Sequence, residues 1–446
     1  MMLGPEAIDR ISARVLDRSR AAQTEVVVIT TDSALTRFAS SAIHQNVAER
    51  NVEVRVRAID GKRAGVATTN DLTDDALDRV AARALEVARH QPADPDLPDL
   101  PQPSELLPVD AYRAETADCS PLTRAQMVRT ICQLALERQL DGSGALTTEL
   151  TEVGVANSRA LRRYEARTRA GLLTVVMDDE GSGYAERSAM SVDDLDAEAI
   201  GREAVEKAVR GRNATRIEPG DYAVVLEEYA VADILNYLAY MGFSALALRE
   251  GTSFLRGKLG QQIVDARISI RDDGREPGTL PASFDYEGVA KQRVPLIEAG
   301  VAAGVVYDSR TAARDTREST GHALPAPNTF GPFPGNLVMA AGDTPKAELA
   351  RPIERGIWVT RLHYVNVVKS EQAALTGLTR DGTFLIENGE ITRPVKNLRF
   401  TENILDAWNG LGEISRERLL IEGWGGGTLA PAMRLERFRF TGVSDV

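Results

Sequence analysis

The segment that most constrains this chain is a proline-rich stretch at residues 91–108, QPADPDLPDLPQPSELLP. It holds six prolines in eighteen positions. Each proline fixes φ and removes a backbone N–H donor, so neither a helix nor a central strand can continue through the stretch. We therefore predict an extended connector without a core of its own. We assign residues 1–90, before the connector, to an N-terminal α/β subdomain.

The chain on either side of this connector shows a similar order of helices and strands. Before it, the apolar spacing predicts helices over 5–21 and 74–90, with strands over 25–30, 52–58 and 65–69. After it, the spacing predicts helices over 122–140 and 194–209, with strands over 146–155, 161–170 and 172–178. We interpret this as a weak internal repeat of helix, antiparallel strands and helix, with a second subdomain over 109–219. A coincidental likeness of two acidic-capped helices remains the alternative.

The pattern changes after Glu218-Pro219-Gly220. A strand and one long helix over 231–248 come first. The remaining residues are mostly short apolar runs between tight-turn dipeptides such as Asp381-Gly382 and Asn388-Gly389. We therefore expect residues 220–446 to form a β-rich domain with one main helix, and we assign the whole chain to the α+β class.

Composition limits the environment and the partners of the protein. The 446 residues carry a net charge of −12, which disfavours a nucleic-acid partner. No run approaches the ~18–20 apolar residues that a membrane span needs, so we expect no membrane partner. The start of the chain has no apolar signal core, and the two cysteines, Cys119 and Cys132, make no disulfide framework. A cytoplasmic protein is the expectation.

General catalytic signatures are missing from the sequence. It contains no GxSxG, no P-loop, no dinucleotide GxGxxG and no CxxC. The glycine-rich run GWGGG at 423–427 lacks the lysine and the helix of a phosphate-binding loop, and we interpret it as a flexible strand crossing. Zinc needs three ligands from His, Cys, Asp or Glu, but no two histidines lie within ten residues of each other. A site of scattered histidines (His44, His90, His322, His363) remains an alternative.

Other polar residues could take part in chemistry or in structure. Ser319 and His322, in RESTGHALP, are the residue types of a nucleophile and its base, but a loop that binds a substrate or partner backbone is the preferred interpretation. Asp272-Asp273 is expected in a hairpin turn, where aspartate bonds the backbone. Asp285 and Glu287 alternate along an expected strand and are predicted to face solvent.

Several longer segments together resemble the TldD/PmbA family. They are 43–65 (IHQNVAERNVEVRVRAIDGKRAG), 249–274 (REGTSFLRGKLGQQIVDARISIRDDG), 281–314, 317–337 and 382–405. The segment RESTGHALPAPNTFGPFPGNL at 317–337 is similar to the version typical of TldE/PmbA-type subunits. The resemblance covers nearly the whole chain, and its motifs are specific in combination although each is weak alone.

The resemblance implies that this chain lacks the family's zinc site. In catalytic TldD-type members, a helix before the Gly-Thr-Ser segment carries HExxxH, and a late cysteine completes the ligands. Counting back from Gly251-Thr252-Ser253 places Asn236, Tyr237 and Met241 at the motif positions. Asn binds zinc poorly, Met prefers softer metals and Tyr is a weak base at neutral pH. The last cysteine of the chain is Cys132.

The resemblance further implies a metal-less TldE/PmbA-type subunit, with no catalytic residue and no cofactor of its own. Zinc is then expected in a TldD-type partner, and the heterodimer would cleave unfolded peptides or peptide-like substrates. Free strand edges would bind extended peptide. The residues expected at the groove or interface are Thr252, Ser253, Arg317, Ser319 and His322.

Two alternatives remain open. One is a stand-alone hydrolase or biosynthetic tailoring enzyme without zinc, using Ser319 and His322 or Tyr237. The other is a protein-interaction regulator of the gyrase-modulator type.

Overall fold

The computed structural model describes residues 2–444. The helices are α1 (Pro5–Arg18), α2 (Asp74–His90), α3 (Ala114–Ala117), α4 (Pro121–Leu136), α5 (Ala197–Arg210), α6 (Glu228–Gly242), α7 (Ala245–Glu250), α8 (Ser309–Arg314) and α9 (Ile404–Asn409). The strands are β1 (Gln23–Ala39), β2 (Ala42–Asp60), β3 (Arg63–Thr69), β4 (Asp141–Asn157), β5 (Arg162–Met177), β6 (Ser182–Ala189), β7 (Gly220–Leu226), β8 (Ile270–Asp272), β9 (Val294–Glu298), β10 (Val301–Ala302), β11 (Asn336–Met339), β12 (Arg355–Lys369), β13 (Ala374–Glu387), β14 (Glu390–Pro394), β15 (Leu398–Asn403), β16 (Leu411–Glu422) and β17 (Gly427–Val443).

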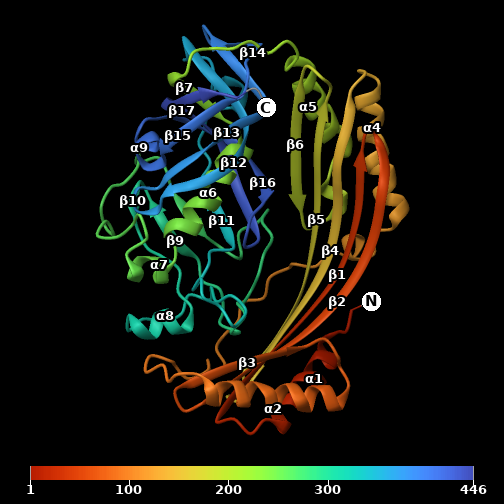
Figure 1. Ribbon diagram of the computed structural model, residues 1–446, viewed down its shortest axis with the longest axis vertical. Coiled ribbons are helices and arrows are strands. Elements are labelled where there is room, and N and C mark those ends of the chain that lie inside the picture. The colour runs from red at the N-terminus through yellow and green to blue at the C-terminus, as the bar shows by residue number, and fades with distance from the viewer. Residues whose placement is uncertain (1, 445–446) are drawn as a thin grey trace.

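The N-terminal half forms one long antiparallel sheet. Within residues 2–444 its six strands follow the order β3-β2-β1-β4-β5-β6. The long strands curve beside the C-terminal strands, with α1 and α2 at one end of the sheet and α4 and α5 toward the other (Figure 1). The units α1–β1–β2–β3–α2 and α4–β4–β5–β6–α5 thus join through β1 and β4, which confirms the expected repeat of helix, antiparallel strands and helix.

Each unit of the repeat buries its own core. Strands β1 and β2 pack with α1 and α2, and strands β4 and β5 pack with α4 and α5. A glycine in the last strand of each unit lets the second helix rest directly on the sheet. A Cβ on Gly65 would lie 2.1 Å from Ala88 N, and a Cβ on Gly183 would lie 2.0 Å from Ala204 O. Neither position can therefore carry a side chain without moving its helix.

The C-terminal half is built around a closed ring of strands. Within residues 2–444, β7 pairs in parallel with β12 and antiparallel with β17, while β12–β13, β13–β15 and β15–β17 pair antiparallel. Strands β11, β8, β9 and β10 extend the sheet from β17. The helix α6 packs on β12 and β17 and is buried on most of its surface, as its apolar sequence requires. The α+β class is confirmed.

Several strands differ from the expected ranges. β1 and β2 are both much longer than the strands expected over 25–30 and 52–58. The unexpected part of β2, residues 42–50, is exposed on both faces, so its sequence shows no alternating apolar pattern that would predict a strand. β5 is one strand where two were expected, since Gly171 continues the ladder opposite Thr147. β6 was not expected at all. Its sequence SGYAERSA has little β-branched character.

The helix expected over 231–248 is also wrong, because two helices occupy this part of the chain. α6 ends at Gly242 and α7 begins at Ala245. Between them, Phe243 O accepts a hydrogen bond from Val306 N at 2.9 Å, and Ala245 N donates to Val306 O at 3.0 Å. These two bonds form a bridge to a distant segment, so the backbone leaves the helix. Tertiary pairing has overridden local helix propensity here.

The proline-rich connector lies on the N-terminal sheet and also contacts the C-terminal half. Residues 91–108 contain no helix or strand, as their prolines require. Leu97 and Leu100 are nevertheless buried against Ile59. Asp96 accepts a hydrogen bond from Arg314 Nε at 3.0 Å. Among residues 2–444, no helix combines the length and apolar character that crossing a membrane would need.

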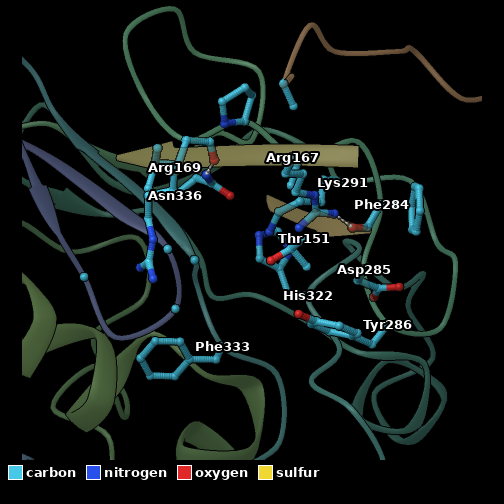
Figure 2. A pocket seen from close by; sticks show the side chains of 18 of the residues that line it. Thr151, Arg167, Arg169, Phe284, Asp285, Tyr286, Lys291, His322, Phe333 and Asn336 are labelled. Atoms are coloured by element: carbon cyan, nitrogen blue, oxygen red, sulfur yellow. Dashed lines mark hydrogen bonds between the residues drawn. The ribbon is translucent and has the colours of Figure 1, made fainter. Parts of the chain in front are cut away.

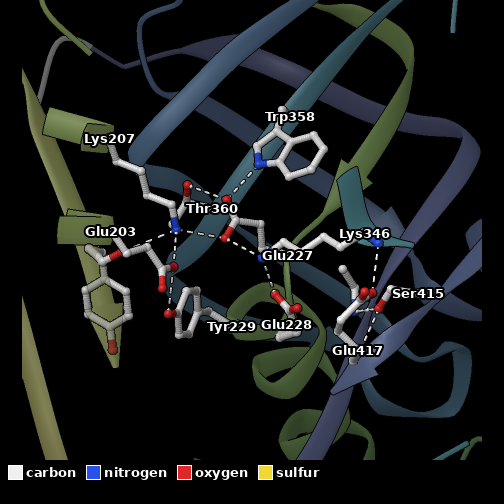
Figure 3. Close-up of polar contacts among 12 residues, drawn as sticks. Glu203, Lys207, Glu227, Glu228, Tyr229, Lys346, Trp358, Thr360, Ser415 and Glu417 are labelled. Atoms are coloured by element: carbon white, nitrogen blue, oxygen red, sulfur yellow. Dashed lines mark hydrogen bonds and ion pairs between the residues drawn. The ribbon is translucent and has the colours of Figure 1, made fainter. Parts of the chain in front are cut away.

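A buried ion network also joins the two halves, centred on Glu227 at the N-terminal end of α6 (Figure 3). Its carboxylate accepts Lys207 Nζ at 2.8 Å from α5 and Lys346 Nζ at 3.1 Å from the segment before β12. Trp358 Nε1 at 2.6 Å and Thr360 Oγ1 at 3.1 Å complete its partners. Burial alone would raise the pKa of Glu227, but the two ammonium groups hold it well below its usual range.

Candidate functional site

One stripe of α6 is left uncovered by the core. Asp233, Tyr237 and Tyr240 are the positions of this helix that are not buried, and their spacing puts them on one face. This face meets the loop between β16 and β17. The ring of Trp424 in that loop lies edge-on to Tyr237 at 4.8 Å and to Tyr240 at 5.8 Å between centroids. The run GWGGG therefore forms a hairpin loop over α6, rather than the expected strand crossing.

The residues at the HExxxH positions have protein partners of their own. Asn236 Nδ2 donates to Ala232 O at 2.9 Å and to Thr428 Oγ1 at 3.2 Å, and its Oδ1 accepts Trp424 N at 3.1 Å. Met241 is packed in the core with 2% of its surface exposed. Tyr237 reaches the uncovered face, but its hydroxyl donates to Val365 O.

This donor set does not fit a zinc ion. An amide already bonded on both sides, a core thioether and a phenol are poor zinc ligands. Among residues 2–444, no three His, Cys, Asp or Glu side chains come together in an arrangement that could hold a metal ion.

Two cavities share Trp424 in their lining. The first, which we call the interdomain cavity, has a volume of about 320 Å³. It is lined by residues of β4 and β5 on one side, and by residues 280–291, 322–336 and 422–426 of the C-terminal half on the other (Figure 2). The second, the α6 cavity, has a volume of about 430 Å³ and lies over the uncovered face of α6. Both volumes fall in the range of small-ligand sites, ~300–1,000 Å³.

His322 lies at the wall of the interdomain cavity, but it does not have the geometry of a general base. Its Nε2 is 2.8 Å from Asp272 Oδ1 and its Nδ1 is 2.9 Å from Thr320 Oγ1. Burial and the nearby charge of Lys291 lower the pKa of His322, so the ring is neutral at pH 7. The network then assigns the proton to Nε2, with Nδ1 accepting from Thr320. Both ring nitrogens are occupied by protein groups.

Asp272 is a buried partner rather than a turn residue. It ends β8 with no exposed surface, and its Oδ2 accepts Asn336 N at 2.7 Å. Burial would raise the pKa of this carboxyl, but Lys291, His322 and Asn336 hold it well below its usual range. The expectation of a hairpin-turn aspartate is wrong for Asp272, because its partners come from segments distant in the sequence.

Lys291 differs from the other cations of this cavity because it is largely buried and has no hydrogen-bonded acceptor among residues 2–444. Only 8% of its side chain is exposed, and its stem passes over Gly274, where a Cβ would lie 3.0 Å from Lys291 Cδ. The ammonium is 3.6 Å from Asp272 Oδ1, which is beyond hydrogen-bond distance. Among residues 2–444 it donates no hydrogen bond.

The arginines of the same cavity are already bonded to protein groups. Arg167 donates to Glu165 and to Phe284 O, and Arg169 donates to Glu422 and Glu149. These bonds hold both guanidinium groups in the wall of the cavity.

Two carboxyl groups with raised pKa values, those of Asp233 and Glu186, line the α6 cavity. Burial and the charge of Glu186 raise the pKa of Asp233 to about 7. Burial also raises the pKa of Glu186, which accepts a hydrogen bond from Tyr184 Oη. Arg361 is close by, but its guanidinium donates to Asp381. His363 and Trp424 contribute to the wall.

The five expected groove residues are not gathered in one place. Ser253 is a core residue, 1% exposed, whose Oγ donates to Gly242 O at 2.8 Å. Thr252 is exposed on the turn after α7. Arg317 lies over the ring of Tyr307 in a separate hollow. Ser319 Oγ donates to Tyr307 O at 3.2 Å, and it is Thr320 that contacts His322.

Asp285 and Glu287 also differ from expectation, because they lie in a buried turn rather than on a solvent-facing strand. Asp285 accepts the backbone N–H groups of Glu287, Val289 and Ala323. Glu287 binds Arg57 at 3.0 Å. Both carboxylates therefore organise the chain around the cavity.

Comparison with known protein families covers most of the chain. Residues 24–88 match the PmbA/TldA metallopeptidase domain 1, residues 116–212 match the central domain, and residues 219–442 match the C-terminal domain. The chain belongs to the TldD/PmbA family.

Relatives within the TldD/PmbA family are called metalloproteases. The chain is 27% identical over 283 residues to a metalloprotease of Methanothermobacter thermautotrophicus, an alignment that covers 59% of this chain and 61% of that protein. It is 24% identical to metalloprotease PmbA of Escherichia coli O157:H7, over 80% of this chain and 79% of that one. The chain thus spans about three fifths of the first relative's length.

A solved structure of the TldD/PmbA family shares the fold. TldE from Thermococcus kodakarensis superposes with a TM-score of 0.87 at 21% identity, covering 98% of this chain and 100% of that chain.

The resemblance to the TldD/PmbA family did not point to several of the residues that line these two cavities. Asp233 could have been predicted as a cavity residue, because it is a charged residue one turn before Tyr237 on an otherwise apolar helix. Lys291 carried no such signal, and the pairing of Asp272 with Lys291 and His322 could not be predicted, since these contacts join segments far apart in the chain.

Proposed function

We propose that this chain is the zinc-less subunit of a TldD/TldE-type heterodimeric metallopeptidase, in which bond cleavage is supplied by a zinc-bearing partner subunit. The observation that carries this proposal is the chemistry of α6. Asn236 and Met241 stand at the histidine positions of the family motif, and both are committed to protein contacts. The name metalloprotease of the relatives supports peptide hydrolysis as the activity of the assembled complex.

In this proposal the chain contributes one wall of the substrate cleft. Its two cavities share Trp424 in their lining, and the α6 cavity lies over the uncovered face of α6. Within residues 2–444, β6 pairs only with β5 and has a free edge, whereas β16 pairs with β17 and is also bridged to Thr344 at Ser415, which leaves part of its outer edge free. Such edges bind extended peptides through main-chain hydrogen bonds, which accept many sequences. Unfolded peptides or peptide-like substrates fit this chemistry.

The geometry does not favour the alternative of a zinc-independent hydrolase that uses Ser319 and His322, because these two side chains are not hydrogen-bonded to each other. The hydroxyl of Ser319 bonds Tyr307 O, and both nitrogens of His322 are occupied by Asp272 and Thr320. No observation at the α6 cavity favours Tyr237 as a base, because its hydroxyl donates to Val365 O.

Metal analysis of the separate chain and of the complex tests the proposal. We expect the isolated chain to contain no stoichiometric zinc and to leave an unfolded peptide such as reduced casein intact. Co-expression with a TldD-type subunit should give a heterodimer with about one zinc and with hydrolysis that a chelator abolishes. Stoichiometric zinc and chelator-sensitive hydrolysis in the isolated chain would refute the proposal.

A further inference from the structure

The ammonium of Lys291 is largely buried at the wall of the interdomain cavity, and among residues 2–444 it donates no hydrogen bond to a protein group. The side chain has almost no exposure, and its charged neighbour, Asp272 Oδ1, lies 3.6 Å away. Asp272 already accepts His322 Nε2 and Asn336 N at shorter distances. Burying a charge is costly unless it is paired and hydrogen-bonded. The three donors of Lys291 therefore need acceptor atoms, and the side chain lines the interdomain cavity, where a ligand could provide them (Figure 2).

The rest of the cavity determines which acceptor would fit. Arg167 and Arg169 each donate two hydrogen bonds to carboxylate or carbonyl oxygens of the protein, which hold both guanidinium groups in the wall. Leu280, Phe284 and Phe333 give the cavity an apolar lining beside the ammonium. Lys291 is the cation of this lining that donates no hydrogen bond to a protein group among residues 2–444, and a charged donor beside an apolar wall is a usual arrangement for holding a small group in a fixed orientation.

The geometry points to a carboxylate-binding subsite in the interdomain cavity, with Lys291 as the group that receives the carboxylate. The ligand would be a carboxylate on a peptide or peptide-like substrate, either the C-terminal α-carboxylate or an acidic side chain. The peptide nature of this ligand rests on the proposed function. The subsite itself rests on the burial of Lys291 and on its position in the cavity. A cavity of about 320 Å³ has room for one terminal or side-chain group with its carboxylate.

Peptides that differ only in the carboxylate test this subsite. The three probes are Ac-Ala-Ala-Phe-Ala with a free C-terminus, the same peptide as its C-terminal amide, and Ac-Ala-Glu-Phe-Ala-amide. Binding is measured by calorimetry on the full chain, and again on its complex with a TldD-type subunit if one forms. The free-acid and glutamate peptides distinguish a C-terminal carboxylate from an acidic side chain. A charge-assisted hydrogen bond should favour one of them over the neutral amide by about 10-fold to 100-fold.

Variants then assign the preference to Lys291. Lys291→Met removes the charge at similar length and should reduce the carboxylate preference to about onefold, while Lys291→Arg should retain part of it. Lys369→Met, at an exposed position of β12, is the matched control and should leave the preference intact. Thermal unfolding of each variant shows that it is folded. If Lys291→Met is not folded, the comparison is made with Lys291→Gln.

Two results would overturn the inference. The first is equal binding of the acid and amide peptides by the wild type, or failure of all three probes to bind at millimolar concentration. The second is a carboxylate preference that survives in Lys291→Met. Either result leaves the proposed function untouched, because that proposal is decided by the zinc content and hydrolysis of the heterodimer.

Discussion

At the residue scale, Asp233 is the charged group with the fewest partners in the α6 cavity. Among residues 2–444 its carboxylate accepts no hydrogen bond, and Arg361 is occupied by Asp381. Burial and the charge of Glu186 raise its pKa to about 7. The folded protein therefore disfavours the ionised form of this carboxyl, so ionisation above pH 7 costs stability.

Asp233→Asn should stabilise the protein at pH 8, and the effect should shrink as the pH falls. The folded pKa is raised above the unfolded value of about 3.8, so the penalty is complete above pH 7 and absent below that unfolded value. The gain in the free energy of unfolding at pH 8 should be on the order of a few kcal/mol. Urea unfolding at pH 8 and pH 5 measures it. Asp406→Asn, exposed on α9, is the control, and an equal gain at both pH values would contradict the prediction.

Only some of these residues could be predicted from the sequence. The sequence singled out His322 and paired it with Ser319, but the carboxylate that His322 contacts is Asp272, fifty positions earlier. It also placed Tyr237 near the family's reactive position, and Tyr237 does face a cavity. Buried pairs such as Lys291 and Asp272 could not be inferred, because a single sequence does not show which distant segments meet.

At the scale of elements, α6 is fixed by close packing against the segment that follows α7. Gly242 is the last residue of this helix, and a Cβ added there would lie 2.2 Å from Phe254 Cε1. Phe254 is itself 1% exposed, so its ring has no space to move aside.

Gly242→Ala should therefore destabilise the protein by about 1–3 kcal/mol, the usual cost of overpacking a core. The better helix propensity of alanine, worth about 1 kcal/mol, offsets this only in part. Urea unfolding with a fixed m-value gives the change. Gly410→Ala, where the nearest atom would be 3.4 Å away, is the matched control and should change stability little. A neutral Gly242→Ala would show that Phe254 can repack.

Helices were easier to predict than strands. The helix over 74–90 has the expected bounds, because its apolar residues recur at the helical period and Thr73 precedes an acidic first turn. The exposed part of β2, residues 42–50, carries no periodic signal, and only its pairing with β1 makes it a strand. The break after Gly242 depends on Val306, which local sequence cannot show.

At the scale of the whole molecule, the Glu227 network links α5 of the N-terminal half to the strands around α6 (Figure 3). Glu227 is the shared acceptor of Lys207 and Lys346, and its side chain is 2% exposed. Removing its charge would leave two buried ammonium groups with fewer partners.

Glu227→Gln should lower the free energy of unfolding by about 3–5 kcal/mol at pH 7, the usual cost of breaking a buried ion pair. Because the folded pKa of Glu227 is depressed, its stabilisation is present above the unfolded pKa and is lost as pH falls through the folded value. Calorimetric unfolding at pH 7 tests this. Glu198→Gln, in an exposed pair with Arg202 on α5, should cost less than about 1 kcal/mol. Equal losses in both variants would contradict the prediction.

The central position of β1 in the six-stranded sheet also has a consequence for how the protein is made. β1 leaves the ribosome before β4, but one of its two edges is completed only by β4, and Glu152 of β4 also binds Leu3 N and Gly4 N. Roughly a hundred residues separate the two strands, which corresponds to about 5–20 s of translation. For that interval the nascent chain presents a long unpaired strand edge. β1 thus waits for β4 before both of its edges are paired, although its pairing with β2 forms from neighbouring residues.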